Sequence, residues 1–214
     1  MGSDYITTTP FYTLDAVDDE LLAEILQCDL IEDWKSVLSE RKVKERLESQ
    51  GIRCNSREDI SWDNATILFT LSISLDSNKI PIKLGDLKNR ERFGRFPSED
   101  GSALNYFTKW TKSARRESNL MERSTYEELM TLISKLNSSI DGSGFSEGHG
   151  GLKIHGWLSR DETSLLRKAI KSGQWGVASD EPLDGGVRDV IKHLVSILRS
   201  AERNDVGILL RSHS

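Results

Sequence analysis

The spacing of apolar residues predicts that helices form most of this chain. Apolar side chains recur at intervals of three and four residues, which places them on one face of a helix. The predicted helices cover residues 15–26, 31–49, 103–114, 126–136, 159–170 and 187–198. Ser159 and Glu162 match the two ends of a capping box, so a helix is expected to begin there. Gly51 and Asp205 mark where two of the helices are expected to end.

Strict alternation of apolar and polar residues predicts strands elsewhere. The clearest strand covers 67–75, where five apolar residues recur at every second position, and we expect it to be central to the sheet. Shorter strands are predicted at 80–84, 152–158 and 206–210. Pro81 cannot donate a hydrogen bond, so 80–84 is expected to be an edge or bulged strand. The mixture predicts an α+β fold with a small, mostly antiparallel sheet covered by helices.

A glycine-rich stretch, residues 141–151, separates two of these elements. Five of its eleven residues are glycine, which lets the backbone bend freely. It lacks the Gly-Lys-Ser/Thr ending of a phosphate-binding loop and the glycine spacing of a dinucleotide fingerprint. We interpret it as a flexible connection, with anion binding by its N–H groups as the alternative. Residues 1–214 are expected to form one domain, and 141–151 is where an internal division would fall.

Charge is unevenly distributed along the 214 residues, whose net charge is −5. Residues 1–34 carry nine acidic side chains and no basic one, whereas 83–116 carry nine basic and four acidic side chains. The two segments could neutralise each other in the fold, or one of them could face a partner of opposite charge. For the second case we expect Asp18, Asp19 and Glu20 to contact a basic protein. The negative net charge argues against general binding to nucleic acid or to anionic membranes.

The sequence shows no secretory signal and no apolar segment of membrane-spanning length, so a cytoplasmic location is expected. Cys28 and Cys54 have neither metal-ligand spacing nor the pattern of a disulfide framework. We therefore predict no metal and no cofactor. The oligomeric state is left open.

Three further sets of residues are candidates for a functional role. His149 and His155 could form an acid–base pair, with Lys153 stabilising a developing anion during phosphodiester cleavage. A basic segment interleaved with aromatic residues has the composition of a nucleic-acid surface. Its cations are Arg90, Arg92, Arg95, Lys109, Lys112, Arg115 and Arg116. Trp157 and Trp175 flank the helix at 159–170 and are candidates for protein contacts.

Two short patches carry a resemblance. Phe11-Tyr-Thr-Leu-Asp15 and the pattern Gly156-Trp-Leu-Ser-x-x-Glu162-x-x-x-Leu166 resemble segments of small uncharacterised bacterial cytosolic proteins. Some of those proteins are suspected to act in immunity or defence, and the resemblance implies a bacterial protein without catalytic activity. The sequence thus predicts a cytoplasmic protein-binding module, inhibitor- or immunity-like. The alternative is a nucleic-acid-binding or phosphodiester-cleaving protein that uses 90–116 and the two histidines.

Overall fold

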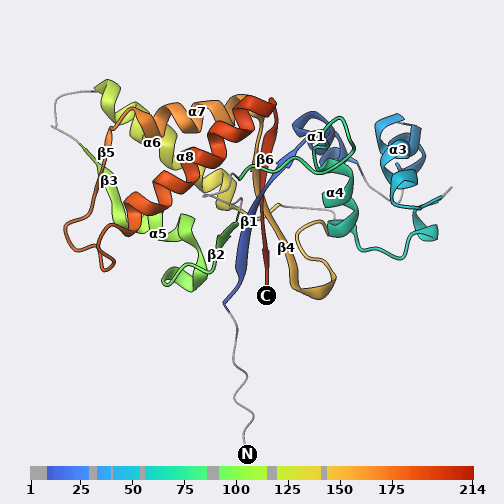
Figure 1. Cartoon of the computed structure of the whole chain (residues 1–214), viewed down its shortest axis with the longest axis horizontal. Coiled ribbons are helices and arrows are strands. Elements are labelled where there is room, and N and C mark those ends of the chain that lie inside the picture. The colour runs from blue at the N-terminus through green and yellow to red at the C-terminus, as the bar shows by residue number, and fades with distance from the viewer. Residues whose placement is uncertain are drawn as a thin grey trace, which may run out of the picture.

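A four-stranded antiparallel sheet lies at the centre of the molecule, in the order β2-β1-β6-β4 (Figure 1). The structure, a computed structural model, describes residues 9–28, 33–39, 41–53, 56–85, 92–114, 120–140 and 144–214. The strands of the sheet are β1 (Phe11–Val17), β2 (Arg92–Gly94), β4 (Leu152–Leu158) and β6 (Gly207–His213). A second antiparallel pair consists of β3 (Thr111–Ser113) and β5 (Trp175–Val177). The α+β architecture is therefore as the sequence predicts.

Helices cover both faces of the sheet, as Figure 1 shows with the strands seen between two groups of helices. On one face are α5 (Ala103–Trp110), α6 (Leu120–Asn137), α7 (Arg160–Lys171) and α8 (Gly186–Asn204). On the other are α1 (Asp19–Gln27), α2 (Trp34–Ser39), α3 (Arg41–Ser49) and α4 (Asn64–Ser72). In β6, Ile208 and Leu210 belong to the first core and Leu209 to the second. This alternation follows from the two-residue period of a strand and buries the sheet on both faces.

Several predicted elements are confirmed. The strand β4 has the predicted bounds, and the capping box forms: Ser159 and Glu162 each accept a hydrogen bond from the other's backbone N–H. Gly51 and Asp205 follow α3 and α8 in the left-handed conformation that ends many helices. Three short 3-10 helices complete the described elements, at Arg57–Asp59, Glu99–Gly101 and His149–Gly151.

The predicted central strand at 67–75 is wrong, because most of this segment forms α4. Asp63 caps the helix by accepting a hydrogen bond from the Thr66 N–H at 2.7 Å. The buried residues Ile67, Leu68 and Leu71 follow helical spacing, although the same run also alternates. A segment that is apolar on nearly every side satisfies both periods, so periodicity alone does not separate a buried strand from a buried helix. The true central strands are β1 and β6.

Three smaller corrections concern strand and helix bounds. Residues 15–17, predicted to start a helix, form the end of β1, and α1 begins only at Asp19. The predicted helix at 103–114 ends at Trp110, where β3 follows. The predicted strand at 80–84 is reduced to one isolated bridge between Leu75 and Pro81.

The described part of the glycine-rich stretch, residues 144–151, packs against the outer edge of β4. The Gly148 N–H donates to the Leu152 carbonyl, and the Ile154 N–H donates to the Ser146 carbonyl, both at 2.9 Å. These contacts replace the flexible connection expected at 144–151, while 141–143 lie outside the described residues. The strands β1 and β2 precede the stretch in the sequence, β4 and β6 follow it, and all four belong to the central sheet.

Candidate functional site

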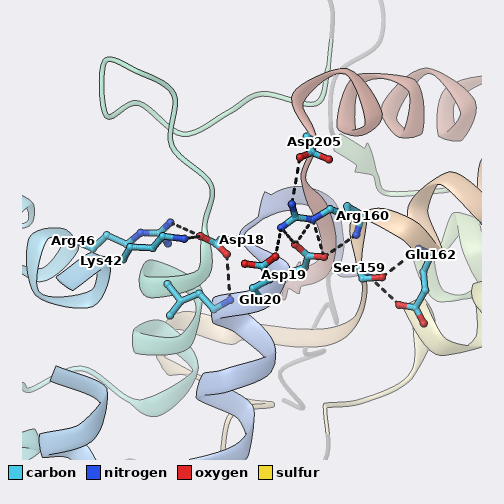
Figure 2. Close-up of polar contacts among 10 residues, drawn as sticks. Asp18, Asp19, Glu20, Lys42, Arg46, Ser159, Arg160, Glu162 and Asp205 are labelled. Carbon is cyan, nitrogen blue, oxygen red and sulfur yellow. Dashed lines mark hydrogen bonds and ion pairs between the residues drawn. The ribbon is translucent and has the colours of Figure 1, made fainter. Parts of the chain in front are cut away.

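Three chain connections meet at one end of the central sheet. They are the turns from β1 to α1, from β4 to α7 and from α8 to β6. The junction is tight at Gly207, where a Cβ atom would lie 2.7 Å from the Leu158 carbonyl oxygen and 2.8 Å from the Asp19 Cβ. Charged side chains from all three connections gather here (Figure 2).

Asp19 and Arg160 form the buried part of this charged site. The Asp19 side chain is only 7% exposed, and its Oδ1 lies 2.8 Å from Arg160 Nη2. Its Oδ2 accepts the backbone N–H of Arg160 at 2.9 Å. Burial by itself raises the pKa of the Asp19 carboxyl, but the hydrogen bonds from Arg160 outweigh it and the pKa is lowered. Conversely, the hydrogen bonds to Asp19 raise the pKa of the Arg160 guanidinium.

Two exposed carboxylates complete the site. Glu20 and Asp205 each lie 3.3 Å from a terminal nitrogen of Arg160, and their side chains are 76% and 79% exposed. One guanidinium therefore faces three carboxylates, as Figure 2 shows, and the site has an excess of negative charge. We call Glu20 and Asp205 the exposed acidic pair.

Asp18, the third predicted acidic residue, is the N-cap of α1. It accepts the Leu21 N–H at 3.2 Å and pairs with Lys42 at 3.2 Å and Arg46 at 3.8 Å. The structure thus brings Asp18, Asp19 and Glu20 to one region, but the first two make internal contacts. Sequence reasoning missed Arg160 and Asp205. The capping box did place residue 160 at the start of a helix, but nothing local showed that it would meet α1.

The acidic and basic segments are neighbours in the sheet, because β1 pairs with β2. The ion pairs described for Asp15, Asp18 and Asp19 join them to Arg211, to Lys42 and Arg46, and to Arg160, all outside residues 83–116. Within the basic segment, Lys109 pairs with Glu99 at 2.7 Å. The Arg95 Nε donates to the Thr9 carbonyl at 2.7 Å.

The histidine-based site is only partly assembled. His155 and Lys153 lie near Ser212, whose Oγ is 2.8 Å from His155 Nε2, and the Tyr12 ring centroid is 5.6 Å from that of His155. Burial, helped by the charge of Lys153, lowers the pKa of His155. His149 is exposed and has different neighbours, with its backbone N–H donating to Asp63 Oδ2 at 2.9 Å. Ser212 and Tyr12 were not predicted for this site, since they come from strands far apart in sequence.

Two aromatic residues of the predicted nucleic-acid surface are not on the protein surface. Tyr106 and Phe107 are fully buried, so neither can stack on a base. Lys112 is exposed on β3, and Arg92 lies in β2. Arg90, Arg115 and Arg116 lie outside the described residues.

The two tryptophans lie in different surroundings. Trp175 packs on the first core, where its ring meets Phe107 edge-on, and its Nε1–H donates to the Ile170 carbonyl at 2.7 Å. Trp157 borders a shallow surface hollow of about 190 Å³. The ammonium of Lys135 lies 5.2 Å from the centroid of the Trp157 ring system. Both tryptophans are half-buried, and each packs against one of the two cores.

Comparisons with protein families, with curated proteins and with solved structures found no match to this chain. Within the described residues, no cluster of three or more His, Cys, Asp or Glu side chains is arranged to hold a metal ion. No described helix combines the length and the apolar character needed to cross a membrane.

Proposed function

We propose that this protein is a non-catalytic module that binds a basic protein partner through the exposed acidic pair, Glu20 and Asp205. The observation that carries the proposal is their exposure of more than three quarters beside a guanidinium already held by Asp19. The proposal keeps the cytoplasmic location and the bacterial inhibitor- or immunity-like role expected from the sequence. Asp18 and Asp19 act in it by fixing α1, and Glu20 makes the contact.

The exposed acidic pair suits the steering of a partner better than tight anchoring. An exposed ion pair contributes about 0–1 kcal/mol, so two carboxylates alone give little affinity. An uncompensated negative site does, however, accelerate the approach of a basic surface, and salt weakens this effect over a screening length of about 10 Å at 0.1 M. Trp157, partly buried on the neighbouring β4 edge, would add apolar contact area.

The experiment is affinity capture with the tagged wild-type protein at low and high salt, compared with a variant that carries Glu20→Gln and Asp205→Asn. The matched control carries Asp180→Asn and Asp184→Asn. These changes remove two exposed carboxylates that precede the N-terminus of α8, whereas Asp205 follows its C-terminus. The 19 residues of α8 separate the two sites by about 28 Å.

We expect the wild type and the control to retain a basic partner at low salt and to release it at high salt. The Glu20→Gln, Asp205→Asn variant should retain little of this partner even at low salt. Equal recovery with that variant would remove the exposed acidic pair from the proposal. Recovery of acidic partners alone would contradict it as well.

A further inference from the structure

A second charged region lies beside the N-cap of α1 and is built differently. It is a surface hollow of about 220 Å³ between α3, Asp18 and the turn that follows Leu75. Its lining residues are Asp18, Lys42, Glu45, Arg46, Ser49, Leu75 and Lys79. Three cations and two carboxylates therefore line it, so the hollow carries one excess positive charge. We call it the basic hollow.

Arg46 has fewer partners than its burial requires. Its side chain is only 12% exposed, and Nη1 is buried with no hydrogen-bond partner among the described residues. Its Nη2 lies 3.8 Å from Asp18 Oδ2, which is long for an ion pair. Buried arginines ordinarily make close, bidentate pairs, because removing the charge from water costs several kcal/mol. Burial accordingly lowers the pKa of Arg46, and Asp18 only partly opposes this effect.

Asp18 satisfies Arg46 only in part, because its carboxylate lies 3.8 Å from Nη2 and is shared with two other donors. It caps α1 through the Leu21 N–H, and it accepts a hydrogen bond from Lys42 at 3.2 Å. Figure 2 shows Lys42 and Arg46 converging on this one carboxylate. Lys79 adds a third cation from a separate segment, where its backbone has a left-handed φ of 61°. For a residue other than glycine, this conformation is uncommon and is often retained at functional positions.

We propose that the basic hollow binds a small phosphate-like dianion, either inorganic phosphate or the phosphoryl group of a small phosphomonoester. Such an anion accepts several hydrogen bonds at once and suits a guanidinium flanked by ammonium groups. It would lie against the Arg46 guanidinium at the wall of the hollow and give it closer acceptors than the Asp18 carboxylate, which is 3.8 Å from Nη2. Lys42, whose side chain is 63% exposed, and Lys79 would hold the outer oxygens. The exposed acidic pair does not line this hollow, so the failure of one proposal would leave the other unaffected.

The test is calorimetric titration of the full chain with inorganic phosphate and, in a second arm, glycerol phosphate. Sodium chloride at equal ionic strength is the blank. We expect saturable binding to the wild type, weakened at least tenfold by Arg46→Gln and severalfold by Lys79→Gln. Lys44→Gln is the matched control, since Lys44 is an exposed cation on the same helix outside the hollow. Tighter binding in the second arm would identify the phosphomonoester as the ligand.

Two results would overturn the proposal. One is the absence of saturable binding to the wild type in both arms, and the other is an equal loss of affinity in Lys44→Gln and Lys79→Gln. If Arg46→Gln fails to fold, Lys79→Gln decides, because Lys79 is exposed on a turn and its replacement leaves the core unchanged. The Glu20→Gln, Asp205→Asn variant should bind phosphate like the wild type, which separates this site from the protein-binding proposal.

Discussion

Asp19 accepts hydrogen bonds from both the backbone N–H and the guanidinium of Arg160, although the two residues are 141 positions apart in the sequence. The contact joins the first turn of α1 to the first turn of α7, on opposite faces of the sheet. A carboxylate that lies at the start of both helices also interacts favourably with both helix dipoles. The contact therefore fixes the end of the sheet from which Glu20 and Asp205 project.

Asp19→Ala should lower the free energy of unfolding by about 3 kcal/mol, because it leaves Arg160 and its backbone N–H without their main acceptor. This value is at the lower end of the range for buried pairs, since the Arg160 side chain is 34% exposed. Urea denaturation measures it. The control Glu20→Ala removes a highly exposed partner of the same guanidinium and should cost less than about 1 kcal/mol. Equal losses in the two variants would show that the buried pair is not the stabilising contact.

The Asp19–Arg160 pair should also make stability depend on pH in the acid range. The pKa of Asp19 is lower in the folded protein than in the unfolded chain, where it is about 3.9. The unfolded chain therefore binds the proton first as the pH falls, and the stability that the pair supplies above pH 4 is lost below it. In unfolding measurements from pH 7 to pH 2, the stability difference between the wild type and Asp19→Asn should be largest at pH 7 and shrink below pH 4. A difference that stays constant would contradict this linkage.

Local patterns identified the elements whose buried side chains follow one period. The helix α8 has a single apolar stripe and β4 alternates cleanly, so both were predicted. The segment 67–75 satisfies two periods, and only the cap at Asp63 and the surrounding packing select the helix. The charged site shows the same limit, since the acidic cluster at 18–20 is visible in the sequence but its partner Arg160 is not. Contacts across 141 residues depend on topology, which local spacing does not encode.

Gly156→Ala should destabilise the protein strongly, because β4 passes very close to the end of α6 at this residue. A Cβ atom at 156 would lie 1.8 Å from the Lys135 carbonyl oxygen and 2.9 Å from Leu136 backbone atoms. The pairing register between β4 and β6 also shifts between Ile154 and Trp157. Overpacking of this kind typically costs about 1–3 kcal/mol, and we expect the upper end since the obstructing atoms belong to the backbone.

Thermal unfolding of Gly156→Ala and Gly176→Ala provides the measurement and its control. Gly176 lies in β5, where an added Cβ would meet no atom within 4 Å. Alanine there should leave the unfolding temperature close to that of the wild type. A similar unfolding temperature for both variants would mean that β4 can move away from α6 without cost.

The last prediction concerns His155, whose imidazole should remain neutral at pH 7. Burial lowers its pKa, and the nearby charge of Lys153 lowers it further. Proton NMR titration should place its midpoint below the ordinary value of about 6.5, and Lys153→Gln should raise that midpoint. The control Lys44→Gln removes an equal charge from α3 and should leave the midpoint unchanged. Since the unfolded chain takes up the proton first, the contribution of His155 to stability should fall as the pH drops through 6.5. A midpoint at or above the ordinary value, or no response to Lys153→Gln, would refute this account of the environment around Ser212 and Tyr12.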